Sequence, residues 1–154
     1  MSVTFDYYFN SDKSLDQLQS EINSWLGCDL APYATDPEDL FARFLGMEFS
    51  LGTHSLDNDR DLDFKSFRYE IGIRIPVPDW EVRDLAISAM VLVILILYRR
   101  LNISAGIFVF DVQKLLGRYE ERKTPEGNFG LFDLVTQNFV TIPGHLNDLY
   151  NYGH

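Results

Sequence analysis

Basic residues are almost absent from the first 64 positions, which contain 13 Asp and Glu against only Lys13, Arg43 and Arg60. Residues 65–154 balance at 10 acidic and 10 basic, so the net charge of −10 comes entirely from the first part of the chain. A local excess of negative charge attracts basic proteins and repels nucleic acid and anionic membranes. We therefore expect a basic protein partner, and we expect no binding to nucleic acid or membrane.

Cysteine is also scarce, since Cys28 is the only one in the chain. A single thiol forms no internal disulfide and supplies too few ligands for a cysteine-based zinc site, which suits a reducing compartment. The first residues lack the basic and apolar regions of a signal peptide. These absences predict a cytoplasmic protein that holds no metal and no cofactor.

Catalytic motifs are missing as well. The three histidines form no HExxH pair, and no glycine-rich phosphate loop or G-x-S-x-G sequence is present. The carboxylates Glu48, Glu70 and Asp111 fall in or beside expected strands, where two of them can meet as a hydrolytic pair. The chain therefore favours a non-enzymatic protein without catalytic residues, and a small hydrolase built around Glu48, His54 and Glu70 is the alternative.

One hydrophobic run is long, although it is too short for a membrane span. Residues 85–98 read LAISAMVLVILILY, whereas spanning a bilayer takes about 20 apolar residues. A helix that is apolar on nearly every side needs cover on nearly every side. We expect a buried helix from Asp79 to about Leu101. An oligomerising structural subunit, such as a homodimer that shares this cover, is a further alternative.

The remaining patterns predict a single α+β domain over residues 1–154. Strand composition or alternation marks residues 3–9, 47–51, 67–75 and 107–110. Ser14 is the expected N-cap of a helix that Gly27 ends, and a short helix is expected from Asp36 to Gly46. With the long helix, the order fits an antiparallel sheet with helices packed on one face, as in a ferredoxin-like β-α-β-β-α-β fold.

A C-terminal extension follows from Val112 onward. We expect a short helix near residues 113–119 and a turn at residues 125–128. The apolar stretches 131–135 and 139–142 are expected to form an added hairpin or irregular packing. This extension does not change the expected fold class.

Acidic residues with neighbouring aromatics mark the expected partner-binding surface. Residues 57–63 alternate carboxylates like the start of a calcium loop, but Leu62 and Arg68 replace the required Gly and Glu. The segment is typical of a solvated hairpin loop, and an acidic docking patch is the functional interpretation. Carboxylates would steer the partner and aromatics would anchor it. The expected partner-binding residues are Asp57, Asp59, Asp61, Asp63, Asp36, Glu38, Asp39, Tyr33, Phe41 and Tyr69.

A short acidic α+β chain without catalytic motifs, with the stretch RLNISAGIFVF at residues 100–110 after its long helix, resembles the small immunity proteins that protect bacteria from delivered toxins. The resemblance is one of size, charge and absence of chemistry, and it carries no residue motif. It implies a protein that neutralises a basic toxin, frequently a nuclease, by stoichiometric binding over the toxin's active site.

Overall fold

The computed structural model describes residues 3–33, 36–44, 47–60, 62–75, 101, 103–111 and 113–140. The helix expected from Asp79 to about Leu101 falls almost entirely outside these residues. The described elements are β1 (Val3–Ser11), α1 (Leu15–Leu26), β2 (Ala31–Tyr33), β3 (Asp36–Phe44), β4 (Met47–Thr53), the 3-10 turn η1 (Phe64–Ser66), β5 (Tyr69–Ile75), β6 (Ile103–Phe110), β7 (Lys114–Lys123), β8 (Phe129–Asp133) and β9 (Asn138–Phe139).

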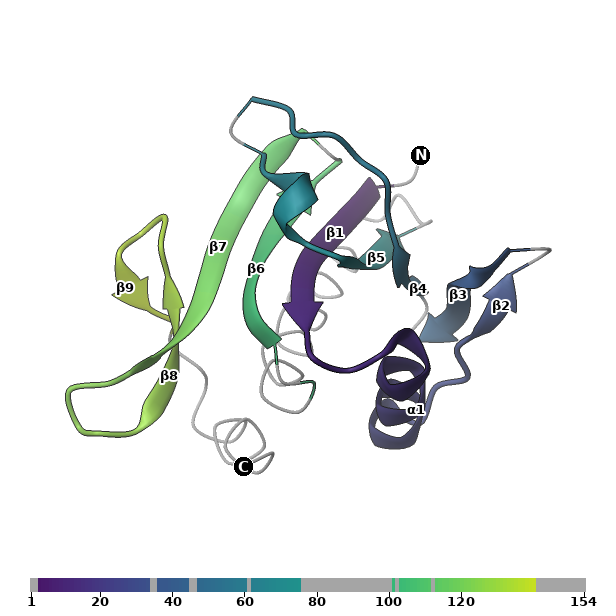
Figure 1. Ribbon diagram of the computed structural model, residues 1–154, viewed down its shortest axis with the longest axis horizontal. Helices are drawn as coiled ribbons and strands as arrows, with labels where there is room; N and C mark the ends of the chain where they lie inside the picture. The colour runs from purple at the N-terminus through teal and green to yellow at the C-terminus, as the bar shows by residue number, and fades with distance from the viewer. Residues whose placement is uncertain are drawn as a thin grey trace.

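All nine described strands join one antiparallel sheet in the order β2-β3-β4-β5-β1-β6-β7-β8-β9 (Figure 1). Strands β1 and β5 lie next to each other in the middle of the sheet, and β2 and β9 form its two edges. The fold is therefore a sheet-rich α+β arrangement, as expected. No helix in the described part of the chain is long and apolar enough to cross a membrane.

The structure confirms several predicted elements, and local contacts explain where helix α1 begins and ends. Helix α1 begins where the Ser14 hydroxyl accepts a hydrogen bond from the Gln17 amide at 3.3 Å, while the Gln17 side chain accepts one from the Ser14 amide at 2.9 Å. This reciprocal pair satisfies two of the free amides of the first turn. Gly27 ends the helix at φ 65°, a conformation that favours glycine. Strands β1, β4, β5 and β6 occupy the expected positions.

The short helix expected from Asp36 is wrong, because this segment is strand β3. Leu40, Phe41 and Phe44 have helical spacing, but Leu40 and Ala42 also alternate with a period of two. β3 pairs with β2 on one side and β4 on the other, and Leu40 and Ala42 are buried. Pairing on both sides outweighs the weak local preference of a short segment.

The helix expected near residues 113–119 is also wrong, because strand β7 covers this segment. Phe108 pairs with Gly117 and Val109 pairs with Leu115, so Leu116 is an extra residue in β7. Such a bulge shifts the phase of the alternation. The sequence pattern of a strand is therefore interrupted in the middle of β7. The turn expected at residues 125–128 is confirmed, and β8 with β9 forms a hairpin.

The two faces of the sheet bury different sets of side chains. On one face, Leu18 and Ile22 of α1 join a large apolar cluster that contains Phe5, Phe9 and Phe49. On the other face, a smaller cluster forms where the connection between β4 and β5 covers Tyr8; the buried members of this cluster are Tyr8, Leu62, Phe64, Phe67, Ile107 and Val109. The smaller cluster covers only part of its face of the sheet. The candidate site lies on the part of this face that no described residue covers.

Candidate functional site

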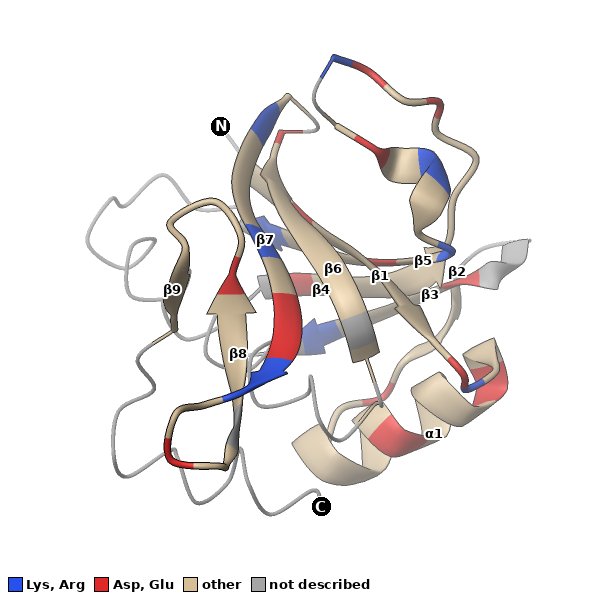
Figure 2. Ribbon diagram, turned by 60° about the vertical axis from the view of Figure 1, so that its left-hand side comes forward, with Lys and Arg blue, Asp and Glu red and all other residues tan. Residues whose placement is uncertain are grey.

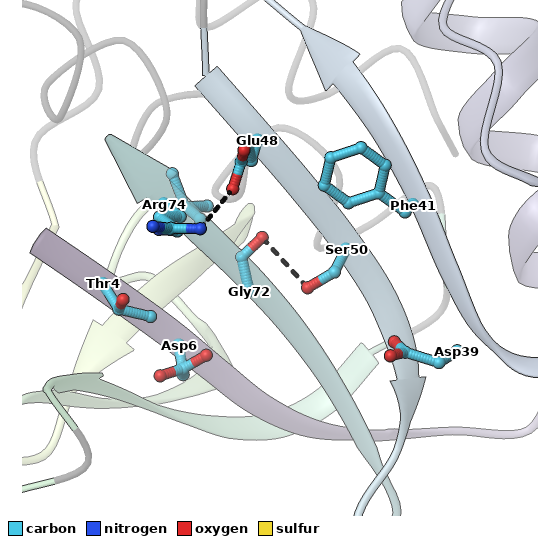
Figure 3. A pocket seen from close by; sticks show the side chains of 9 residues that line it. Thr4, Asp6, Asp39, Phe41, Glu48, Ser50, Gly72 and Arg74 are labelled. Atoms are coloured by element: carbon cyan, nitrogen blue, oxygen red, sulfur yellow. Dashed lines mark hydrogen bonds and ion pairs between the residues drawn. The ribbon is translucent and has the colours of Figure 1, made fainter. Parts of the chain in front are cut away.

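A groove of about 360 Å³ lies on the sheet face opposite α1, over β1, β3, β4 and β5 (Figure 3). Most of its lining residues alternate with the core residues of the same strands, and Ile73 is the one that belongs to the core. The residues that line it are Thr4, Asp6, Asp39, Phe41, Glu48, Ser50, Gly72, Ile73 and Arg74.

The hollow follows from one row of residues across four strands. Phe41 pairs with Ser50, Ser50 with Gly72, and Gly72 with Asp6, so the four lie side by side on one face. Small residues stand in the middle of the row and larger ones at its ends. A Cβ atom on Gly72 would lie 2.5 Å from Ser50 Oγ and 3.2 Å from Asp6 Oδ1, so both side chains reach over this glycine. The Ser50 hydroxyl donates to the Gly72 carbonyl at 3.5 Å.

The next row places an ion pair at one end of the groove. Arg74 on β5 donates to Glu48 on β4 across 3.1 Å (Figure 3). Arg74 is the only basic residue in the described lining of the groove, and its guanidinium is directed at Glu48. Arg43 continues this row on β3, outside the lining. Among the described residues, Arg74 forms no hydrogen bond or ion pair with the other two carboxyl groups of the groove, Asp39 and Asp6.

Asp6 is the buried carboxyl of the site. Its exposed fraction is only 3%, and it stands among the strand residues at the centre of the sheet. Burial is the main cause that raises the pKa of Asp6, to about 8, followed by its hydrogen bond to Glu70 and the negative charges of Glu70 and Asp111. A carboxyl with its pKa raised in this way favours the protonated form at neutral pH.

Glu70 connects this carboxyl to Tyr8. The Tyr8 hydroxyl donates to Glu70 Oε1 at 3.5 Å, and Tyr8 and Glu70 are paired across β1 and β5. Burial, with the nearby negative charge of Glu70, raises the pKa of the Tyr8 hydroxyl, so the phenol keeps its proton and remains a donor. Glu70 is less buried than Asp6, and its carboxyl accepts the hydrogen bond of the Tyr8 hydroxyl.

Both ring nitrogens of His54 form hydrogen bonds with main-chain groups. Nδ1 accepts a hydrogen bond from the Leu56 amide at 3.2 Å, so the proton lies on Nε2, which donates to the Phe67 carbonyl at 2.6 Å. The ring also packs edge-on against Tyr8, with 5.0 Å between the ring centroids. These contacts hold the connection between β4 and β5 on the sheet and leave His54 without a free nitrogen for catalysis.

The acidic segment 57–63 lies on this same connection, whose outer rim carries acidic positions in Figure 2. Asp57 forms a solvent-exposed ion pair with Lys65 at 3.0 Å, and Asp59 and Leu62 exchange two main-chain hydrogen bonds. Asp63 accepts a hydrogen bond from the Ser66 hydroxyl, which is the main cause that lowers the pKa of Asp63. Asp61 lies outside the described residues. In the described part of the chain, no group of three or more His, Cys, Asp and Glu is placed to hold a metal ion.

The other expected partner-binding residues divide into three groups. Asp39 is exposed, Phe41 is half-buried, and both line the groove. Tyr69, which we expected to anchor the partner, is completely buried on the α1 side, where its hydroxyl donates to the Lys13 carbonyl at 2.8 Å, so it does not line the groove. Tyr33, Asp36 and Glu38 belong to β2 and β3, and their side chains are outside the description.

Sequence reasoning missed Asp6 and the small residues of the groove. The signal for Asp6 was present, because a carboxylate stands inside the otherwise apolar strand VTFDYYF. A charged residue is rarely buried without a special environment. The small residues Ser50 and Gly72 gave no comparable signal, since the groove depends on the register that brings them together.

No family model, no curated protein and no solved structure matches this chain. Inference about its function therefore rests on the residues and geometry of the groove.

Proposed function

We propose that this chain is a non-enzymatic acidic binding protein that holds a basic protein partner at the groove. The observation that supports this proposal most strongly is the lining of the groove, in which three carboxyl groups surround a hollow and the one lining arginine is bonded to Glu48. A long basic side chain fits such a hollow, because its charged end meets carboxylates while its stem packs on apolar surface.

Phe41 and Asp39 supply the two kinds of contact that a lysine or arginine needs. Phe41 lies at one end of the row that forms the hollow, so its ring can cover the aliphatic stem or face the cation. Asp39 lies on the same strand, two residues before Phe41, and its side chain is exposed. It can form a charge-assisted hydrogen bond with the lysine or arginine. An anchor of this kind in a hollow is typical of residues that contribute most of the binding energy in protein interfaces.

The acidic loop of residues 57–63 would act mainly by attracting the basic partner before the two proteins touch. Asp57 and Asp63 lie on the connection that covers the same sheet face as the groove. Exposed charges near a binding site raise the association rate and change the dissociation rate less. The finer form of the proposal is an immunity protein that neutralises a basic, nuclease-like toxin by stoichiometric binding. The charge asymmetry between residues 1–64 and 65–154 supports this form.

For the fold, we propose the finer ferredoxin-like class. In that fold, the first strand lies between the third and fourth strands, and all neighbours are antiparallel. Strands β4, β5, β1 and β6 follow this order, with α1 between β1 and β4 along the chain. The hairpin β2–β3 would then be an insertion at one edge, and β7–β9 an extension at the other. The fold alone carries no function.

A small hydrolase is the second candidate, and one observation favours it. Asp6, a carboxyl with a raised pKa, lies beside Glu70 next to a groove, and pairs of carboxyl groups act as acid and base in several enzymes. This pair differs from the one expected from the sequence, because Glu48 is bonded to Arg74 and His54 has both nitrogens in main-chain contacts. Turnover of a substrate that Asp6→Asn abolishes would support this candidate.

The test of the binding proposal is affinity capture at low salt, followed by kinetics with the captured partner. Asp39→Asn should raise the dissociation rate, whereas Asp57→Asn combined with Asp59→Asn should mainly lower the association rate, and only at low salt. Glu126→Gln, an exposed change at the turn between β7 and β8, is the matched control. The proposal would be contradicted if the captured partner were acidic. It would also be contradicted if neither salt nor Asp39→Asn changed the association and dissociation rates.

A further inference from the structure

Three polar side chains, Asp6, Glu70 and Tyr8, lie close together on the groove face of β1 and β5. Asp6 lines the groove, and its hydrogen bond with Glu70, which also accepts from the Tyr8 hydroxyl, is one of the causes that raise the pKa of Asp6. Asp6 has an exposed fraction of only 3%, so its carboxyl borders the groove without being open to bulk solvent.

We propose that Asp6 carries a proton while the groove is empty and releases it to solvent when a cationic group of the partner enters. This inference rests on the proposed function, because it assigns the ligand as an ammonium or guanidinium group and identifies Asp6 as its ionisable contact. The step balances simply: the carboxyl O–H bond breaks, the proton leaves to buffer, and the negative charge formed on Asp6 meets the positive charge of the ligand.

The charges around Asp6 explain why the empty groove keeps this proton. The described titratable or charged groups on the strands and loops around it are Tyr8 on β1, Glu70 and Arg74 on β5, Glu48 on β4, Asp39 on β3, and Asp111 after β6. Arg74 is bonded to Glu48, and the acidic neighbours Glu70 and Asp111 oppose a second negative charge. Burial acts in the same direction.

An entering cation reverses this balance. An opposite charge within about 4–6 Å lowers a carboxyl pKa by roughly 1–3 units, which brings the pKa of Asp6 from about 8 to between about 5 and 7. Binding near pH 7 therefore releases a proton. Affinity should rise with pH up to about pH 8, by at most about tenfold for each pH unit, because one proton is exchanged.

The experiment uses a hexalysine peptide as the probe, with calorimetry at pH 7 and low salt in two buffers of different ionisation enthalpy. We expect the wild-type protein to release a substantial fraction of one proton for each peptide bound. Asp6→Asn should bind without proton release and with a flatter pH dependence. Asp39→Asn should bind more weakly yet release the same fraction, and Glu126→Gln should match the wild type.

The possible failures separate the two proposals. Binding of hexalysine without proton release would overturn the inference and leave the proposed function standing, whereas no binding at any pH would overturn both. Glu70→Gln provides a second variant in case Asp6→Asn does not fold; it should reduce proton release because the acceptor and charge that retain the proton are lost. Carboxyl ¹³C NMR of the free protein offers an independent check, and an ordinary acidic titration of Asp6 would also overturn the inference.

Discussion

The face of the sheet that packs on α1 and the face that carries the groove come from alternate residues of the same strands. Strand β1 presents Phe5, Tyr7 and Phe9 to the α1 side, and it presents Asp6 and Tyr8 to the other side. The α1 side is filled by large apolar side chains. The groove side has Gly72 and Ser50 where a filled face would have large side chains, and the carboxyl of Asp6, whose pKa is raised, where it would have an apolar group.

The two faces therefore differ in how much they contribute to the stability of the fold. Burial of apolar side chains contributes about 1.5–3 kcal/mol for each large residue, and the α1 side contains most of them. A buried carboxyl costs free energy unless it keeps its proton or finds a partner. The groove side therefore contributes less to stability than the α1 side, and we interpret its small and polar residues as features of the proposed binding site.

The largest expected difference between the faces concerns two phenylalanines on neighbouring strands. Phe49 on β4 is completely buried on the α1 side, and Phe41 on β3 is half-buried at the groove. Phe49→Ala should lower the free energy of unfolding by about 3–5 kcal/mol because it leaves a cavity in the core. Phe41→Ala should cost less than half as much in urea denaturation. Equal costs would mean that the two faces are packed alike.

A second prediction concerns the pH dependence of stability through Asp6. Its pKa is raised from 3.8 in the unfolded chain to about 8 in the folded protein, so the folded state binds the proton more tightly. The contribution is complete below about pH 4 and is lost as pH rises to about 8, with a slope of at most about 1.4 kcal/mol for each pH unit. Denaturation at several pH values measures this slope.

Asp6→Asn should remove that part of the slope and stabilise the protein at pH 8, because the amide donates to Glu70 as the protonated carboxyl does. Asp39→Asn is the matched control on the same face, since its side chain is exposed. A wild-type stability that increases between pH 4 and pH 8, with no change in Asp6→Asn, would contradict a buried proton at this position.

The smallest effect tests the α1 side at its helix terminus. Ser14→Ala removes the hydroxyl that accepts the Gln17 amide, and loss of such a cap costs about 1 kcal/mol. Thermal unfolding should show this loss without any change in binding to the groove. Weaker hexalysine binding in Ser14→Ala would show that the two faces are coupled.

The sequence predicted the elements whose signals are local. The alternation of residues 67–75 gave β5, and the Ser14 cap with the Gly27 stop gave α1, because these patterns depend on neighbouring residues alone. Strand β3 was mistaken for a helix because strand pairing, which is non-local, outweighs the weak preference of nine residues. In β7, the bulge at Leu116 concealed the alternation.

The site was predictable only in part for the same reason. Asp39 and Phe41 were expected to bind a partner, and the structure places both at the groove. Tyr69 was expected to anchor a partner, but it lies in the core beside Phe9, on the same face as Ile71 and Ile73. A one-residue difference in register changes the face of every side chain. The groove itself depends on four strands in register, which no single segment of sequence encodes.

The most direct test of the account is to map hexalysine binding by amide NMR of the ¹⁵N-labelled protein at low salt. We predict that the largest shifts occur in the groove, at Ser50, Gly72 and Asp6, and that residues on the α1 side, such as Ile22, remain unchanged. Asp39→Asn should reduce these shifts, and Glu126→Gln should not. Shifts spread evenly over all acidic segments, or concentrated on α1, would contradict the claim that the groove is the binding site.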